Sequence, residues 1–439
     1  MSDVAVTSGS RLDHPGPDHL RVALYSGVVF GHDAVSTSFL HKLRILTRLR
    51  DAGFPVVVTG FTQATDYVDP DIRLVRGLSD LMRSPEFATA DVHVFEYTMW
   101  YELLNALFLI DRPSLVIDHN TTPVELINEP EVRLACERSR HERHNLTRAT
   151  YVATDGEFTR DELLAMGFAA DSVSALHLPA ATATPVGSST VDRRRPGDPV
   201  RLLYIGRFVR AKGVLDLLDA VEALWTDGTA DVTLTMAGSI RFPDTAVLAA
   251  IEEACAAHRE DGLVTMHVDA PDDEIAALYA ASDVLVMPSH HEGFCVPVIE
   301  AMTSGCYVIG SDAGNIPFVM GGLGTQFPCG DTDALALAIA GYTDEITSAE
   351  RDLREPVLTT TAGAFGLAEW HVRVLRHLEA YGAEQYEAGF LHLLAVVLER
   401  GTTQGAPSWL ADAERRARTP SPGAEDHTPD RSMLSVPSR

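Results

Sequence analysis

The stretch His290-His-Glu-Gly-Phe-Cys-Val-Pro-Val-Ile-Glu300-Ala-Met decides how the rest of the chain is interpreted. It follows an apolar run at residues 284–287 that is typical of a buried parallel strand, and a helical pattern occupies residues 296–303. The order predicts a strand, a glycine-containing loop and a helix. The free backbone N–H groups at the start of such a helix bind anions or hydroxyl groups. We expect Glu292 on the loop and Glu300 inside the helix to grip separate parts of one polyhydroxylated ligand.

Apolar runs of the same kind, separated by helix-compatible stretches, occur on both sides of this stretch. They lie at residues 21–25, 55–59, 92–95, 115–117, 151–153 and 175–178, and again at 201–205, 232–236, 264–268, 284–287 and 307–309. Alternating strands and helices indicate parallel sheets with helices on both faces. We therefore predict an α/β protein with two doubly wound, Rossmann-like domains that face each other across a cleft. Their ligand-binding loops belong at the carboxyl ends of the strands.

The 439 residues exceed what one hydrophobic core organises, and 46% of them are hydrophobic. Two segments rich in Pro, Ser, Thr and Arg have no apolar period. We predict a flexible N-terminus at 1–19, a first domain at 20–180, a linker at 181–199, a second domain at 200–366, helices at 367–400 that pack back on the first domain, and a disordered tail at 401–439.

The charge balance argues against nucleic acid as the main partner. The chain has 35 Lys and Arg against 62 Asp and Glu, a net charge of −27, which repels phosphate backbones and anionic lipid surfaces. Lys42 and Lys212 are the only lysines.

The cysteines and the apolar segments indicate a cytoplasmic protein. The five cysteines are widely spaced without a C-x-x-C pair, which argues against a disulfide framework or a thiolate zinc site. The first twenty residues lack a signal-peptide pattern, and no stretch approaches the roughly 18 apolar residues of a spanning helix.

The motif around Glu292 resembles that of the retaining glycosyltransferases of family 4, which have the GT-B fold and an E-x7-E motif of the form EGFxxPxxEAM. The matching residues are Glu292, Gly293, Phe294, Pro297, Glu300, Ala301 and Met302. Ile205-Gly-Arg207-Phe-Val-Arg-Ala-Lys212-Gly213 resembles the G-R-x-x-x-x-K-G segment of the family, and Asp118-His119-Asn120-Thr-Thr-Pro123 resembles the Y-H-N-x-T-P segment of one branch. Gly31-His-Asp-Ala34 resembles the glycine loop of the first domain, and Ser311-Asp-Ala-Gly-Asn315 the loop after the motif helix.

The resemblance implies a role for each of these residues. The donor would be a nucleotide-diphosphate sugar, with Glu300 on the ribose hydroxyls and Glu292 on the transferred sugar, beside Gly293, Phe294 and Cys295. Arg207, Lys212 and Gly31 would hold the diphosphate, so that no metal or other cofactor is expected. His119 and Glu292 would lie at the reacting centre, and the sugar would be transferred with retention of its anomeric configuration.

Two departures from the family pattern concern the acceptor. Asp118 stands where the branch usually has Tyr, and Glu96 stands where it tends to have His. We predict that Glu96, Asp118 and Asn120 bind the acceptor, and that the two carboxylates suit a cationic or zwitterionic small molecule, such as an amino sugar, an aminocyclitol or a betaine. The pathway expectation comes from a different observation: the excess of arginine over lysine suggests a GC-rich genome, which fits natural-product or small-thiol biosynthesis.

Other functions stay open. The chain fits a glycan or capsule glycosyltransferase, or a non-catalytic sugar-nucleotide-binding homologue, and less well an epimerase or phosphorylase. A nicotinamide oxidoreductase is disfavoured because Gly27-Val-Val-Phe-Gly31 is not G-x-G-x-x-G. His290 and His291 beside Glu292 lack the spaced partner that a metal site needs. The nucleotide base, the sugar and the oligomeric state, including a homo-oligomer, remain undetermined.

Overall fold

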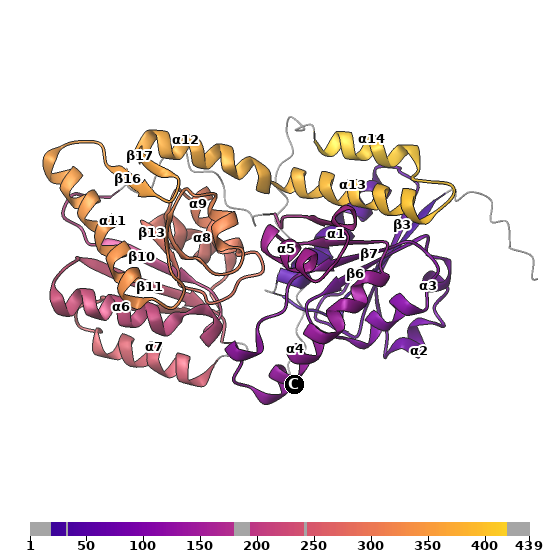
Figure 1. The fold of residues 1–439 in the computed structure, drawn as a ribbon, viewed down its shortest axis with the longest axis horizontal. Helices are drawn as coiled ribbons and strands as arrows, with labels where there is room; N and C mark the ends of the chain where they lie inside the picture. Colours follow the sequence, from indigo (N-terminus) through magenta and orange to yellow (C-terminus); the bar gives the residue numbers. More distant parts are fainter. Residues whose placement is uncertain (1–18, 32–33, 180–193, 241–243, 419–439) are drawn as a thin grey trace, which may run out of the picture.

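The computed structural model describes residues 19–31, 34–179, 194–240 and 244–418. Two α/β domains lie side by side, and the final helices run along one edge of both (Figure 1). The predicted N-terminus, most of the linker and residues 419–439 of the predicted tail lie outside the described residues.

The first domain is built on a seven-stranded sheet in the order β5-β3-β1-β6-β7-β8-β9, with every pair of strands parallel. The strands are β1 (Leu20–Tyr25), β3 (Val56–Thr62), β5 (Ile72–Leu74), β6 (Val92–Tyr97), β7 (Ser114–Asp118), β8 (Tyr151–Thr154) and β9 (Val173–Ala175), with a separate pair β2 (Val28–Val29) and β4 (Ala64–Thr65). Its helices are α1 (Ala34–Asp51), α2 (Leu78–Leu81), α3 (Pro85–Thr89), α4 (Pro130–Glu142) and α5 (Glu157–Ala165). Short 3₁₀ helices are η1 (Glu102–Phe108), η2 (Val124–Leu126), η3 (Arg143–Arg148) and η4 (Ala170–Ser172).

The second domain has a six-stranded parallel sheet in the order β12-β11-β10-β13-β14-β15. The strands are β10 (Val200–Ile205), β11 (Val232–Gly238), β12 (Val264–Val268), β13 (Val284–Met287), β14 (Tyr307–Ser311) and β15 (Thr325–Phe327), and β16 (Val357–Thr360) and β17 (Gly363–Gly366) form a hairpin. Its helices are η6 (Arg210–Lys212), α6 (Val214–Asp227), α7 (Thr245–Ala257), α8 (Asp272–Ala281), α9 (Val296–Thr303), α10 (Ile316–Met320) and α11 (Thr332–Asp352).

The predicted fold class, two doubly wound domains with parallel sheets, is confirmed. One strand boundary is wrong: the strand expected at 175–178 lies at Val173–Ala175, where it pairs with β8. The apolar residues after it, Leu176 and Leu178, are buried in the hydrophobic core that both domains share. They were taken for strand residues because a buried connection has the same apolar pattern as a buried strand.

The helices after the second domain return to the first. Helix α12 (Leu367–Leu378) contacts α9, and after η7 (Glu379–Tyr381) helix α13 (Ala383–Gly401) packs on β6, β7 and α1 (Figure 1). The prediction of a disordered tail from residue 401 is wrong for α14 (Ser408–Ala417), which packs on α13. Leu410 of α14 is buried, and the ring of Trp409 lies 5.5 Å from that of Phe54. A few apolar residues at helical spacing suffice to order a helix when a neighbouring helix offers them a surface.

No helix in the described part of the chain combines the length and the apolar character that crossing a bilayer requires.

Candidate active site

The motif loop lies at the carboxyl end of β13 and leads into α9, which begins with Cys295 at its N-cap and Pro297 in its first turn. Cys295 has a φ of 82°, a left-handed conformation that is rare outside glycine. None of the hydrogen bonds among the described residues is donated by the backbone N–H of Gly293 or Phe294. The helix start therefore offers donors to a ligand, as its sequence predicts.

Glu292 and Lys212 form an ion pair across this loop. Their Nζ and Oε1 atoms are 2.7 Å apart, and the same carboxylate oxygen accepts a hydrogen bond of 2.7 Å from Ser289. Lys212 ends η6, and the following Gly213 has a φ of 62°. A Cβ atom at Gly213 would lie 1.9 Å from the carbonyl oxygen of Pro288, so only glycine lets the Lys212 segment dock against the motif loop.

Arg207 is exposed, and its backbone carbonyl accepts a hydrogen bond from Tyr204. Its charge reaches the first domain, because it opposes the rise that burial causes in the pKa of the Cys136 thiol on α4. Arg207 is therefore near enough to the first domain for its charge to act there, whereas its predicted partner Lys212 is turned to Glu292.

Glu300 lies inside α9, where Tyr279 donates a hydrogen bond of 2.9 Å to its Oε2 atom. Burial raises the pKa of Glu300 to about 7, which the Tyr279 hydrogen bond only partly counters. Near neutral pH this carboxyl is thus divided between the acid and the carboxylate.

His119 is held between two carboxylates of the first domain. Its Nδ1 atom is 2.7 Å from Asp155 and its Nε2 atom 2.7 Å from Glu96, and all three side chains are buried. Burial opposes a charge on the ring, but Asp155 and Glu96 outweigh it and raise the pKa of His119 to about 10. His119 is therefore an imidazolium at neutral pH and is not a proton acceptor.

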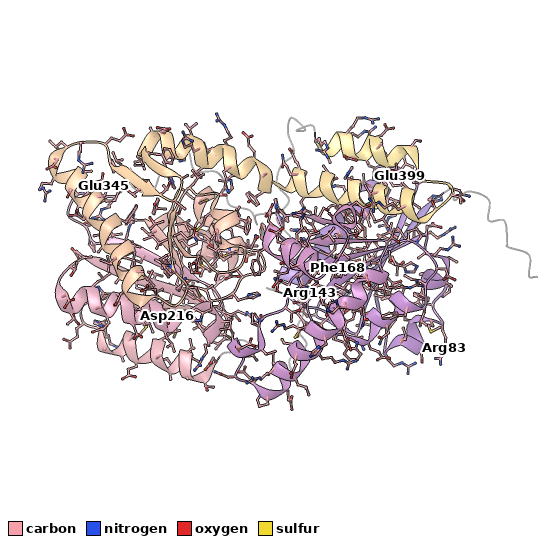
Figure 2. The ribbon with its side chains drawn as sticks, in the orientation of Figure 1. Arg83, Arg143, Phe168, Asp216, Glu345 and Glu399 are labelled. Carbon is pink, nitrogen blue, oxygen red and sulfur yellow. The ribbon has the colours of Figure 1, made fainter. Side chains whose placement is uncertain are left out.

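Glu96 and Asp118 do not face an acceptor in this structure. The carboxylate of Glu96 pairs with Lys42 as well as His119, and Asp118 is fully enclosed, with Arg143 Nε 2.6 Å from its Oδ2 atom. Figure 2 labels Arg143 on the first domain, in the part that borders the second. Both carboxylates are thus neutralised by cations of the protein itself, because buried charges need partners, and their contact with a cationic acceptor stays a prediction.

The domains meet where the predicted site residues of both halves lie. The Oδ1 atom of Asn120 is 3.2 Å from His291 Nε2. A Cβ atom at Gly293 would lie 2.7 Å from the carbonyl oxygen of His119. Asn120 has a φ of 69°, which turns its backbone at this junction, and Asn315 accepts a hydrogen bond from the Phe158 N–H of the first domain. The fold therefore brings the His119 segment and the motif loop together.

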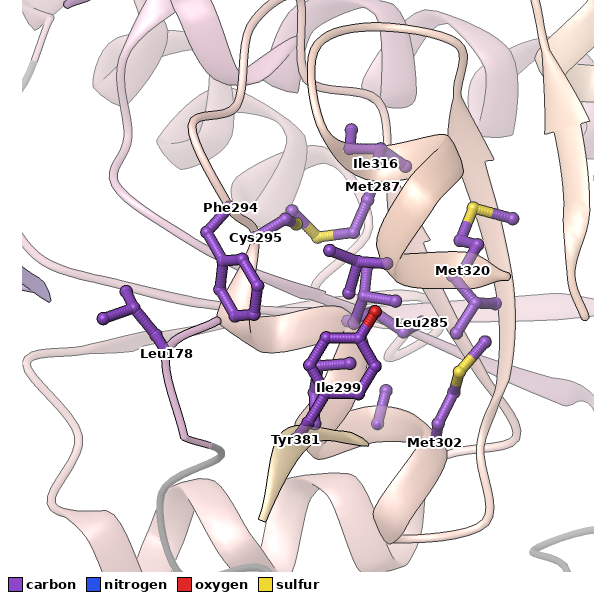
Figure 3. Close-up of a cluster of buried hydrophobic side chains, with 14 of the residues drawn as sticks. Leu178, Leu285, Met287, Phe294, Cys295, Ile299, Met302, Ile316, Met320 and Tyr381 are labelled. Carbon is purple, nitrogen blue, oxygen red and sulfur yellow. The ribbon is translucent and has the colours of Figure 1, made fainter. Parts of the chain in front are cut away.

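Phe294 packs its side chain into the protein core, and the buried thiol of Cys295 lies beside the carboxylate of Glu292. Figure 3 shows both in a cluster of buried hydrophobic side chains with Leu178 and Tyr381. The ring of Phe294 lies 6.1 Å from His177 and 5.9 Å from Tyr381. The prediction that Phe294 lines the donor pocket therefore applies only to its backbone, whereas the side chain of Cys295 lies next to Glu292.

Gly31 donates its N–H to the carboxylate of Asp66 at 3.3 Å. A carboxylate at this position repels a phosphate group, so the geometry gives no support to the predicted contact between Gly31 and the diphosphate.

Sequence reasoning missed several residues of the site, among them Asp155, Tyr279 and Arg143. Asp155 directly follows β8, so the rule that points to the carboxyl ends of strands could have found it. Lys42 was noted for its rarity but was given no place. The contacts of Tyr279 and Arg143 cross between elements and leave no signal in the sequence.

The two histidines before Glu292 have partners of their own, since His290 Nε2 is 2.5 Å from Asp216 Oδ2. Within the part of the chain that the structure describes, no group of three His, Cys, Asp or Glu side chains is arranged to hold a metal ion.

The architecture matches solved structures of the GT-B class. A sucrose-phosphate synthase from Thermosynechococcus elongatus superposes with a TM-score of 0.61 at 20% identity, over 86% of this chain and 98% of that one. Residues 199–344 match the family model described as glycosyl transferases group 1, so the second domain is a glycosyltransferase domain.

Two proteins with similar sequences are both named as mannosyltransferases. An O-antigen chain mannosyltransferase B of Escherichia coli is 27% identical over 216 residues, which are 46% of this chain and 53% of the relative. An MMP alpha-(1->4)-mannosyltransferase of Mycolicibacterium hassiacum is 34% identical over 113 residues, 26% of each chain. The chain thus matches about half of the first relative and about a quarter of the second.

Proposed function

We propose that this protein transfers a glycosyl group from a nucleotide-diphosphate sugar to a hydroxyl of a small soluble acceptor, with retention of configuration, in natural-product or small-thiol biosynthesis. The observation that carries the transferase proposal is the pairing of Lys212 and Glu292 at the head of α9, at the junction with the His119 segment. The family model over residues 199–344 supports the same reaction class.

Lys212 is the cation that would meet the leaving diphosphate. A dianionic group entering beside α9 competes with Glu292 for Lys212, and Arg207 near the first domain adds a second positive charge. Together with the N–H groups of the helix start these cations balance the leaving charge, so the proposal includes no metal. Glu292, released from Lys212, is then able to accept hydrogen bonds from the sugar, and Glu300 from the ribose.

Because His119 is protonated, it cannot take the acceptor proton, and a diphosphate oxygen is left to do so. This supports attack on the face from which the diphosphate leaves. The acceptor oxygen bonds to the anomeric carbon, the bond from that carbon to the diphosphate oxygen breaks with its electron pair, and a diphosphate oxygen takes the acceptor proton. His119 cannot serve as the base, because both ring nitrogens lie on carboxylates. We assign it a fixed positive charge beside the reacting sugar.

Extension of a glycan by mannose is the second candidate. The similarity to an O-antigen chain mannosyltransferase over 216 residues favours it. Both candidates place the enzyme in the cytoplasm, a location that the absence of disulfides among the five cysteines supports.

Nucleotide release tests the proposal. The full chain is mixed with UDP-, GDP- and ADP-sugars, and free nucleoside diphosphate is measured with and without acceptors, including a mannosyl oligosaccharide. We expect release with one nucleotide class and loss of release in Glu292→Gln. A rise in melting temperature without any release would instead assign a binding protein. Proton NMR of the product distinguishes retention from inversion.

A further inference from the structure

The other lysine of the chain, Lys42, lies in the first domain, whereas Lys212 lies in the second. Lys42 on α1 is fully buried, and its Nζ atom lies 2.9 Å from Oε1 and 3.3 Å from Oε2 of Glu96. It also donates to the hydroxyl of Ser38, one turn earlier on the helix. Burying a lysine costs several kcal/mol unless a partner compensates its charge, so this position demands an explanation.

Glu96 connects Lys42 to His119. One oxygen of its carboxylate accepts from Lys42 at 2.9 Å, and the other lies 2.7 Å from His119 Nε2. The second ring nitrogen of His119 lies 2.7 Å from Asp155. A neutral imidazole has one N–H, so it would set a bare nitrogen against a carboxylate at one of these contacts. The geometry therefore requires two N–H groups on the ring.

The charges of this network balance only when Lys42 is present. Lys42 and His119 contribute two positive charges, and Glu96 and Asp155 contribute two negative ones. Without Lys42 the buried cluster would hold one cation against two carboxylates, and protonation of Glu96 would relieve the excess. His119 and Asp155 then remain as a balanced pair, and the contact between Glu96 and His119 Nε2 is no longer an ion pair.

The crossing helix α13 closes the network from outside the first domain. The hydroxyl of Tyr386 lies 3.3 Å from that of Ser38, and Lys42 Nζ is 5.6 Å from the centre of the Tyr386 ring and 6.0 Å from that of Phe390. At the other end, the Oδ1 atom of Asp155 is buried without a hydrogen-bond partner among the described residues. The charged chain therefore runs from the crossing helix to the domain junction.

We propose that Lys42 is a positioning residue of the active site: it keeps Glu96 ionised, and the Glu96 carboxylate in turn holds the charged ring of His119 in a fixed orientation beside the reacting sugar. The inference rests on the proposed function for its catalytic consequence. The effect on the His119 ring is a property of the folded protein and is measured without substrate.

Ring NMR tests the inference directly. Protein labelled with ¹⁵N-histidine is compared as wild type, Lys42→Met and Lys42→Arg, with the His119 signals assigned by His119→Gln. We expect two ring N–H protons on His119 at pH 8 in all three proteins. In Lys42→Met the Nε2 proton should shift upfield and exchange faster with water, because its carboxylate partner becomes neutral, whereas Lys42→Arg should match the wild type. Two unchanged ring protons in a folded Lys42→Met would overturn the proposal.

A matched variant separates positioning from stability. Arg194 in the second domain is a buried cation that pairs with Glu350 at 2.9 Å, far along the chain from His119. Arg194→Met is expected to lower the melting temperature as Lys42→Met does and to leave the His119 signals unchanged. An equal change of those signals in both variants would assign Lys42 a general structural role.

A double-mutant cycle serves if Lys42→Met does not fold. Glu96→Gln combined with Lys42→Met removes both charges of the pair, which is less destabilising than removing one. If Lys42 acts through Glu96, adding Lys42→Met to Glu96→Gln changes neither the ring signals nor kcat further. Additive losses would contradict the inference. We expect a fall of about 10-fold in kcat with little change in donor KM for single variants. A wild type that releases no nucleotide contradicts the proposed function alone, since the ring measurements remain valid.

Discussion

Lys212 and Glu292 share a contact of 2.7 Å that joins two segments 80 residues apart in the sequence, one from each predicted donor-binding motif. Each residue neutralises the other, and both side chains are largely shielded from solvent. Under the proposed function, a diphosphate would have to draw Lys212 away from Glu292 before both act on the donor.

Removal of this cation tests the arrangement. Lys212→Met is expected to lower nucleotide release by about 100-fold, because it deletes a charged donor at the leaving group. Arg210 is the control, since it is exposed on the same 3₁₀ helix and Arg210→Met should change release less than about twofold. Equal losses in the two variants would mean that only the overall charge of the segment matters.

The raised pKa of Glu300 predicts a pH dependence of nucleotide binding. The folded pKa is about 7, so the carboxylate, which we propose accepts hydrogen bonds from the ribose hydroxyls, becomes populated as the pH rises from 6 to 8. We expect nucleotide affinity, measured by calorimetry, to increase through this range, and Glu300→Gln to bind more weakly with a flat profile. A dependence that persists in Glu300→Gln would assign it to another group.

The same group affects stability with the opposite sign. Its pKa is raised above the unfolded value of about 4.3, so the folded state binds more protons between that value and about 7. The free energy of unfolding should therefore fall as the pH rises through this window. Glu300→Gln should lose this part of the pH dependence in denaturant titrations at pH 5 and pH 8.

Phe294 couples the motif loop to both connections between the domains. Its ring packs on His177, just after the first domain, and on Tyr381, between α12 and α13. Phe294→Ala should cost about 3–5 kcal/mol of stability, and it should also reduce nucleotide release. Phe61→Ala removes an equally buried ring from the separate core of the first domain and should cost similar stability with normal release per folded molecule. Normal release in folded Phe294→Ala would refute the coupling.

The backbone of Gly314 packs directly against the backbone of Glu292. With a φ of 56°, a Cβ atom there would lie 2.3 Å from the carbonyl oxygen of Glu292, so Gly314→Ala should displace the loop and abolish most nucleotide release. Gly330 has a φ of 76° and open space around the added Cβ. Gly330→Ala should therefore cost only about 1 kcal/mol of backbone strain, measured by thermal unfolding, with release unchanged. Similar losses of release would show that backbone strain alone explains the first variant.

The sequence predicted most of the frame on which the site lies. Strand β13 and helix α9 occupy the residues that the apolar pattern indicated, because both strand and helix show a local periodicity in the sequence. Helix α14 escaped prediction, since its order depends on the surface that α13 and Phe54 provide.

What the sequence determined by itself is therefore the local part: the order of strands and helices, the glycine loop before α9 and the spacing of Glu292 and Glu300. Only the tertiary structure decided which charges meet. Glu96 and Asp118 look like exposed acceptor ligands in one dimension, yet Lys42 and Arg143 pair with them in the folded protein. The physical reason is that burial forces every charge to find a partner, and the partner comes from a different element whose distance along the chain carries no information about its distance in space.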